Sequence, residues 1–220
     1  MEQTLELEMT IEDGISLLSP FRKTGILGGT FNPIHNGHVD MALAIRQEFS
    51  LDRVFLLPSG DPPHKTCEHL ATKQQRLHMA ELCAFDHSCL SVCDMEIKRE
   101  GVTYTVDTMA ELCLQYPQND FHFIIGSDTL FDLESWKDFP LLCRMTQFVC
   151  VKRDEHDRTR IAAEIARLAR EYRAMILPSQ YSGLFISSSY IRKRVAEGKS
   201  IADFVPAPVE VYIHESRLYK

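Results

Sequence analysis

The segment "GILGGTFNPIHNGH", residues 25–38, joins a strand pattern to a helix pattern and contains four glycines and two histidines. Its apolar start indicates a strand that ends at Gly28 and Gly29, and helical spacing begins near Gly37. Because glycine has no side chain, backbone N–H groups of such a turn can approach an anion, to which the next helix presents its positive end. Thr30 adds a hydroxyl donor. The segment therefore predicts a phosphate-binding turn.

The two histidines of this segment, His35 and His38, are more than a turn requires. An imidazole N–H can donate to a phosphoryl oxygen and stabilise the charge that builds up during phosphoryl or nucleotidyl transfer. A zinc site, completed by His64 or His69, and a purely structural capping role are the alternatives. Zinc would leave the glycine turn without a role, and a single histidine would suffice as a cap. We therefore expect both rings to face a bound phosphate.

Short apolar runs alternate with helical patterns along the rest of the chain, which predicts a parallel sheet covered on both sides. The predicted strands are 25–29, 53–59, 89–97, 121–127, 147–153 and 174–178, and the predicted helices are 37–49, 73–84, 106–116, 129–143 and 158–172. In such a doubly wound, Rossmann-like α/β fold, ligands bind at the carboxyl ends of the strands.

The domain organisation follows from the same pattern. Residues 1–24 form an acidic N-terminal extension of unassigned role, and residues 25–220 form a single domain with a small helical part from about 187 to 220. The one long polar loop, 59–75, is a candidate lid.

The composition is that of an ordinary globular protein, with 45% hydrophobic and 25% charged residues. Its apolar runs are far shorter than the roughly 20 residues of a membrane span, and its acidic N-terminus is unlike a signal peptide, so we expect a cytoplasmic protein. The seven cysteines form no C-x-x-C pair and are expected to be buried reduced thiols. A net charge of −7 favours a small anionic ligand over nucleic acid.

A second segment, "ISSSYIRKR" at 186–194, also fits an anion site. Its serines are typical of a helix start, where the first amides and Arg192 would face a polyphosphate. Alone, it fits a serine cap on a solvated basic helix equally well. Together with the first segment, the anion site is favoured.

The two segments resemble the H-x-G-H and I-S-S-T-x-I-R signatures of the nucleotidyltransferase superfamily. From about residue 24 to the end, the chain is similar to the bacterial nicotinate-nucleotide adenylyltransferases. This likeness rests on "LPSGDPPHK" at 57–65, "YTVDTM" at 104–109, "FIIGSD" at 123–128 and "SWKDF" at 135–139. The resemblance implies a fold of the nucleotidyltransferase type.

The resemblance implies that ATP and nicotinate mononucleotide react to give deamido-NAD and pyrophosphate, a step of NAD biosynthesis. Mg²⁺ would enter with ATP, with no protein ligand. Catalysis is implied for His35, His38 and Arg192. ATP or phosphate contacts are implied for Gly28, Gly29, Thr30, Phe31, Lys65, Ser188 and Ser189. Mononucleotide contacts are implied for Thr105, Trp136 and Arg153, and ribose contacts for Gly126 and Asp128.

The sequence departs from the family pattern at three places. Asn32 replaces a common Asp, Ser189 replaces the usual Thr, and the Pro-Gly that often follows the arginine at Arg153 is missing. Each residue taken alone also has a structural reading. Lys65 and Arg153 could be solvated, Thr105 and Asp128 could be helix caps, and Trp136 could be a partly buried aromatic.

Three other functions stay open. They are an adenylyltransferase that prefers nicotinamide mononucleotide, a phosphopantetheine adenylyltransferase, and a non-catalytic nucleotide-binding protein. The sequence also leaves a homo-oligomer open.

Overall fold

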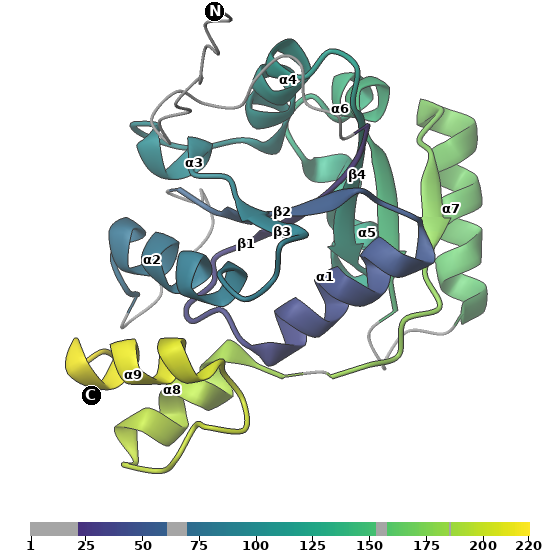
Figure 1. The fold of residues 1–220 in the computed structure, drawn as a ribbon. Coiled ribbons are helices and arrows are strands. Elements are labelled where there is room, and N and C mark those ends of the chain that lie inside the picture. Colours follow the sequence, from purple (N-terminus) through teal and green to yellow (C-terminus); the bar gives the residue numbers. More distant parts are fainter. Residues whose placement is uncertain (1–21, 61–69, 153–157, 185) are drawn as a thin grey trace, which may run out of the picture.

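The computed structural model describes residues 22–60, 70–152, 158–184 and 186–220 (Figure 1). In these ranges the chain forms a six-stranded sheet in the order β3-β2-β1-β4-β5-β6, in which every neighbouring pair is parallel. The strands are β1 (Lys23–Gly29), β2 (Arg53–Pro58), β3 (Leu90–Val92), β4 (Asp120–Gly126), β5 (Gln147–Val151) and β6 (Ile176–Pro178). The predicted doubly wound α/β class is confirmed.

Helices cover both faces of this sheet (Figure 1). They are α1 (Asn36–Glu48), α2 (Lys73–Ala84), α3 (Met95–Lys98), α4 (Thr105–Gln115), α5 (Ser127–Asp132), the 3-10 helix η1 (Leu133–Ser135), α6 (Phe139–Met145), α7 (Arg158–Tyr172), α8 (Ser188–Ala196) and α9 (Ala207–Glu215). Residues of α1, α2, α8 and α9 pack on one face, and residues of α4, α6 and α7 pack on the other.

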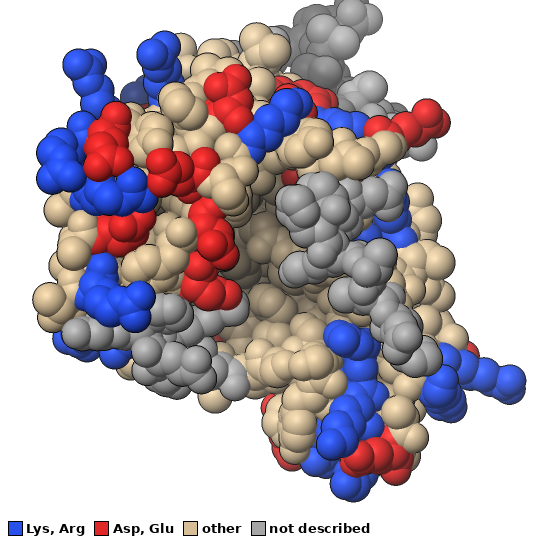
Figure 2. All heavy atoms as spheres, turned by 180° about the vertical axis from the view of Figure 1, so that it is seen from behind, with Lys and Arg blue, Asp and Glu red and all other residues tan. Residues whose placement is uncertain are grey.

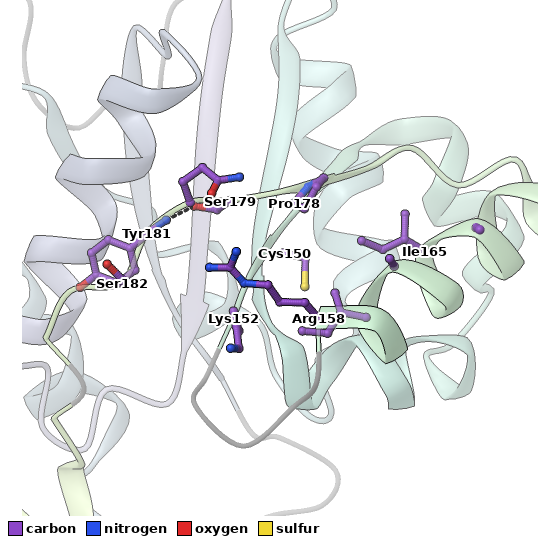
Figure 3. A pocket seen from close by; sticks show the side chains of 12 residues that line it. Cys150, Lys152, Arg158, Ile165, Pro178, Ser179, Tyr181 and Ser182 are labelled. Atoms are coloured by element: carbon purple, nitrogen blue, oxygen red, sulfur yellow. Dashed lines mark hydrogen bonds between the residues drawn. The ribbon is translucent and has the colours of Figure 1, made fainter.

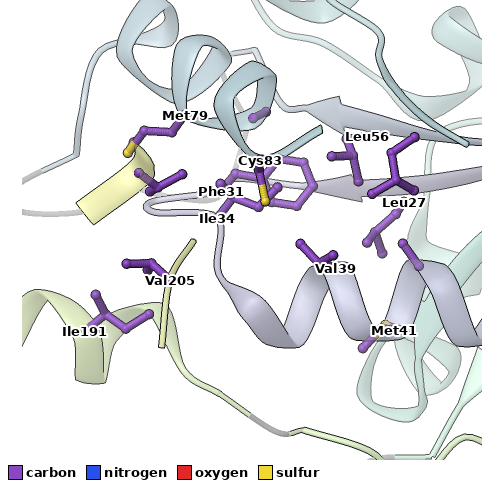
Figure 4. Packing of buried hydrophobic residues seen from close by; sticks show 14 of the residues in the cluster. Leu27, Phe31, Ile34, Val39, Met41, Leu56, Met79, Cys83, Ile191 and Val205 are labelled. Atoms are coloured by element: carbon purple, nitrogen blue, oxygen red, sulfur yellow. The ribbon is translucent and has the colours of Figure 1, made fainter. Parts of the chain in front are cut away.

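The strand β1 lies at the centre and feeds both cores because its side chains alternate in direction. Leu27 joins the core below α1 and α2, and Ile26 joins the opposite core with α4 and α6. Figure 4 shows that Phe31 and Ile34, from the turn after β1, lie between α2 and the start of α1. The apolar residues of the turn therefore anchor it in the core.

Two predicted elements are wrong in part. The strand predicted over 89–97 ends at Val92, and residues Met95–Lys98 form α3 instead. The helix predicted over 129–143 is divided into α5, η1 and α6. Trp136 is extended and Asp138 has a left-handed φ of 50° before Pro140. A proline ring cannot continue a helix that is already formed, so a new helix starts there.

The C-terminal helices share the core of the sheet. Ile191 of α8 and Val209 of α9 are completely buried in the cluster that contains Val39 of α1. The first amide of α1, Asn36 N–H, donates to the carbonyl of Phe204 at 2.8 Å. These contacts support our proposal that residues 25–220 are a single domain.

Asn32, in the turn after β1, connects three segments. Its side-chain oxygen accepts hydrogen bonds from the Ala71 N–H at 3.1 Å and from the Tyr219 hydroxyl at 2.8 Å. Asn32 is 4% exposed and Tyr219 is 8% exposed, so both bonds are sheltered from water.

Tyr219→Phe removes one of these bonds without changing the packed volume. We expect it to lower the free energy of unfolding by about 1 kcal/mol, the usual net value of a buried neutral hydrogen bond. Urea denaturation followed by circular dichroism measures this change.

Tyr190→Phe is the matched control, because Tyr190 is 45% exposed and its hydroxyl accepts an exposed hydrogen bond from Nη1 of Arg194 at 3.1 Å. We expect a change within about 0.5 kcal/mol for this exposed site. Equal effects of the two variants would contradict the role of Tyr219.

Candidate active site

The strand order changes direction between the paired strands β1 and β4. From β1 the chain continues outward to β2 and β3, and from β4 it continues to β5 and β6 on the opposite side. Ligands of open parallel sheets bind at such a switch point, outside the carboxyl ends of the strands. Figure 2 shows a face that is hollowed at its centre, with uncharged side chains in its depth, acidic side chains along one rim and a group of Lys and Arg on the protruding part below.

The turn after β1 has an accessible backbone. Gly28 is exposed at the end of the strand. An added Cβ at Gly29 would lie 2.8 Å from the Phe31 ring, so only glycine fits there. Phe31 itself has a φ of 50°, a left-handed conformation that is costly for a bulky residue. Its ring is buried in the core, so any ligand contact of Phe31 involves its backbone.

The two histidines lie together at the start of α1. Their rings stack with centroids 3.7 Å apart, and the rings of Phe31 and His38 are nearly perpendicular, with centroids 5.0 Å apart. Nδ1 of His38 accepts the backbone N–H of His35 at 3.3 Å. Because Nδ1 is an acceptor, the proton of a neutral His38 is on Nε2, which makes that nitrogen a donor. Capping and donation are therefore compatible in this residue.

The second segment lies against the first. Nη1 of Arg192 donates to the carbonyl of Asn32 at 2.8 Å, and the Ser188 hydroxyl donates to the carbonyl of Pro33 at 2.9 Å. The structure thus brings Arg192 and Ser188 to the turn that carries the histidines. The capping expected of the serines differs, because Ser187 makes no side-chain cap and its hydroxyl bonds to that of Ser189 at 2.6 Å.

The first amide of α1 does not point to an anion site as the sequence predicts. The sequence suggested that its positive end faces the anion, yet Asn36 N–H is taken by Phe204. The positive end of α1 is therefore used partly to hold the C-terminal part in place.

Thr105 and Trp136 are both predicted to contact the mononucleotide. Residues next to them in the sequence contact one another. Lys137 pairs with Asp107 of α4 at 2.9 Å, and its ammonium lies 4.4 Å from the centre of the Tyr104 ring. Thr105 is the first residue of α4, not its cap. Trp136 meets the ring of Phe123 edge-on at 5.7 Å. The indole is held in place by core contacts and stays partly exposed.

Gly126 and Asp128 follow β4. Gly126 is the residue before α5, and Asp128 is exposed in the first turn of that helix. Beyond them, between β5, β6 and the start of α7, lies a cavity of about 400 Å³ (Figure 3). Cys150, Lys152 and Arg158 line one part of it, and Ile161, Ile165 and Pro178 supply apolar surface. The sequence did not point to this cavity.

Cys150 forms a neutral part of this cavity wall. Burial raises the pKa of its thiol to about 11, and the negative charge of Asp128 contributes in the same direction. Cys83 and Cys93 are also buried, and burial raises the pKa of the Cys93 thiol to about 11 as well. The described cysteines are free thiols, as expected.

Several predicted residues lie outside the described ranges. These are Lys65, Arg153, Cys67 and the possible zinc ligands His64 and His69. In the part of the chain that is described, no group of three or more His, Cys, Asp or Glu could hold a metal ion. Across the same ranges, none of the helices combines the length and the apolar character that a membrane crossing needs.

Gly37 lies between the two histidines in the sequence, and Gly37→Ala tests how closely it packs against Leu184 and His35. An added Cβ would lie 2.7 Å from the carbonyl oxygen of Leu184 and 3.3 Å from Nδ1 of His35. We expect the variant to lose about 1–3 kcal/mol of unfolding free energy by overpacking. In an open helix the same change would gain roughly 0.5–1 kcal/mol, so a stabilised variant in chemical denaturation would contradict this packing.

The chain resembles known proteins over most of its length. Residues 26–194 match the model of the cytidylyltransferase-like family. A probable nicotinate-nucleotide adenylyltransferase of Lachnoclostridium phytofermentans is 40% identical over 90% of this chain and 99% of its own length. Another, of a Synechococcus species, is 40% identical over 90% of this chain and 95% of its own.

A solved structure has the same fold. It is the nicotinic acid mononucleotide adenylyltransferase of Plasmodium falciparum in complex with NaAD, with a TM-score of 0.72 at 21% identity over 90% of this chain and 97% of that one. The confirmed fold and the identity over nearly the whole length lead to one assignment: the chain belongs to the cytidylyltransferase-like family and, within it, to the nicotinate-nucleotide adenylyltransferases.

Proposed function

We propose that this protein transfers the adenylyl group of ATP to nicotinate mononucleotide, giving deamido-NAD and pyrophosphate, a step of NAD biosynthesis. The observation that carries the proposal is the junction of the two signature segments. The stacked pair His35 and His38 and the guanidinium of Arg192 meet at the turn after β1, held by the Arg192 bond to Asn32. The names of the 40% identical relatives agree with this reaction.

In the proposed reaction, a phosphate oxygen of the mononucleotide attacks the α-phosphorus of ATP in line. A new P–O bond forms as the bond to pyrophosphate breaks, and no covalent enzyme intermediate is needed. Negative charge grows on the α-phosphoryl and leaving oxygens, where the Nε2–H of His38 and the guanidinium of Arg192 would donate. His35, Ser188 and the glycine turn would hold the triphosphate in position.

The proposed metal is Mg²⁺, carried by the phosphates of ATP. The turn offers N–H, hydroxyl and guanidinium donors, which suit phosphate oxygens rather than a cation. Mg²⁺ characteristically keeps substrate phosphates among its ligands. When bound, it would neutralise part of the triphosphate charge.

The cavity beside α7 is a good candidate for the adenine ring. The charge of Asp128, the proposed ribose contact, helps to raise the pKa of Cys150 in the cavity wall, and the base is attached to the ribose. Its lining from Ile161, Ile165 and Pro178 suits a flat uncharged ring, and Ser179 and Gln180 offer polar groups at its edge.

The proposed acceptor site is formed by Trp136, in the connection from β4 to β5, and by Thr105, at the start of α4. The partly exposed Trp136 offers a face for a pyridine ring, and Thr105 offers a hydroxyl to its carboxylate. Lys65 and Arg153 remain proposed phosphate contacts. The cytoplasmic compartment and the absence of a nucleic-acid partner stay predictions, and the oligomeric state stays open.

Pyrophosphate release from ATP distinguishes the candidate functions. Nicotinate mononucleotide, nicotinamide mononucleotide and phosphopantetheine are supplied separately at equal concentration. We expect release to be fastest with nicotinate mononucleotide. Faster release with another acceptor would replace our assignment with that acceptor, and no release with any of them would favour a non-catalytic nucleotide-binding protein.

His38→Ala removes a proposed transition-state donor. We expect kcat to fall by about 100-fold or more, as for the loss of other preorganised donors. Steady-state kinetics and a thermal melt are compared with those of His78→Ala, which removes an exposed histidine of α2. A His38→Ala variant with near-normal kcat would refute the mechanism.

Ala162→Trp tests the adenine cavity by filling it from α7. Since loss of the base contacts would forfeit at least ~1.4 kcal/mol, we expect the KM for ATP to rise about tenfold or more. The KM for the mononucleotide should change little. The neighbouring Ala163→Trp is the control, because Ala163 is exposed and does not line the cavity. Equal KM values for ATP in both variants would argue against this position of the base.

A further inference from the structure

Two buried charged residues next to the proposed site have no part in the reaction described above. Arg76 of α2 is 1% exposed and Glu96 of α3 is 7% exposed. Burial of a charge is costly unless hydrogen bonds and opposite charge compensate for it. Their contacts therefore indicate what they hold in place.

Arg76 gathers the loops at the carboxyl ends of two strands. Its Nη1 donates to the carbonyls of Thr30 at 2.9 Å and Ser59 at 2.6 Å. Its Nη2 donates to the carbonyl of Gly60 at 3.1 Å, and its Nε to that of Ala71 at 3.3 Å. One guanidinium thus links the phosphate turn after β1 with the segment after β2.

Glu96 holds the same segment from the other side. Its Oε2 accepts the Gly60 N–H at 3.3 Å and the Thr103 hydroxyl at 3.2 Å. Its Oε1 accepts the Thr108 hydroxyl of α4 at 3.0 Å. Thr103 and Thr108 flank Thr105, so this carboxylate fixes the start of the helix proposed to meet the acceptor.

A single peptide group lies between the two charges. The carbonyl of the Ser59–Gly60 peptide points to Arg76, and its N–H points to Glu96. The negative end of this dipole therefore faces the cation and its positive end faces the anion, which stabilises both charges. Residue 60 must be glycine, because an added Cβ would lie 2.4 Å from the Glu96 carbonyl oxygen.

We propose that Arg76 and Glu96 are positioning residues, bridged through the Ser59–Gly60 peptide, that set the phosphate turn at the correct distance from the acceptor end at Thr105. The inference rests on the proposed function. Both substrates must be aligned for in-line attack, and a small displacement between their sites costs rate more than affinity.

The test compares Glu96→Ala with Glu96→Gln. Glutamine keeps an oxygen for Gly60 and Thr103 and can donate to the Thr108 hydroxyl, so it preserves the bridge. At a temperature where all variants are folded, we expect Glu96→Ala to lower kcat by about 10-fold to 100-fold. The KM for ATP should change less than about threefold, because Glu96 is not a proposed ATP contact.

Glu96→Gln should stay within about threefold of the wild-type kcat, since it retains the bridging oxygen. Glu100→Ala, at an exposed carboxylate two residues beyond α3, is the matched control and should have no effect. Unchanged kcat per folded molecule in Glu96→Ala would refute the positioning role. A loss in Glu96→Gln as large as in Glu96→Ala would refute the bridge.

Amide hydrogen exchange at Gly60 tests the bridge without substrates. We expect faster exchange in Glu96→Ala and wild-type protection in Glu96→Gln. Wild-type exchange rates in Glu96→Ala would overturn the bridge. If the wild-type protein made no dinucleotide at all, the proposed function would fail, whereas these exchange rates would still report on the bridge itself.

Discussion

Three hydrogen bonds to Asn32 join the turn after β1 to α8, to the segment before α2 and to the end of the chain. The carbonyl of Asn32 accepts Arg192 of α8, and its side-chain oxygen accepts the Ala71 amide and the hydroxyl of Tyr219 near the C-terminus. Segments that are far apart in the sequence therefore meet at one residue of the turn after β1. Asparagine supplies the acceptor oxygen of the common Asp without adding a negative charge where a triphosphate is proposed to bind.

The side-chain donors of the two histidines, Arg192 and Arg76 all lie around the turn that follows β1. His38 of the stack contacts the Phe31 ring and accepts the His35 N–H, and Arg76 donates to the carbonyl of Thr30 in the same turn. The proposed site is preorganised, because partly buried bonds orient its donors in the absence of a ligand. Direct transfer between two bound phosphates depends mainly on this kind of positioning and electrostatic stabilisation.

The sequence predicted the sheet and the turn because both leave local signals. Apolar runs with turn residues locate the strands, and α7 has the bounds 158–172 that its helical spacing predicts. The predicted elements that differ from the structure are not determined by local sequence alone. Residues 95–98 are apolar enough for a strand, yet Glu96 is drawn into bonds with Gly60 and Thr108. Within 129–143, Pro140 is a sequence signal for the start of a new helix, but the apolar spacing continues through it and predicts one helix.

Within the site, the resemblance of the two segments implied that Arg192 and the histidines act together, and in the structure Arg192 bonds at the turn that carries the histidines. The sequence could not predict that Arg192 bonds to Asn32, that Phe204 takes the first amide of α1, or that a cavity opens beside Cys150. These contacts join residues from distant parts of the chain and leave no periodic pattern. The pairing of Lys137 with Asp107, which joins the two proposed acceptor contacts, is of the same kind.

The stereochemistry at the α-phosphorus distinguishes one in-line displacement from two, because one site that aligns both substrates permits a single displacement. The measurement uses ATP with a chiral thiophosphate at the α position and nicotinate mononucleotide, and determines the configuration of the dinucleotide product. Our account predicts inversion. Retention would require two successive displacements through a covalent intermediate and would contradict it.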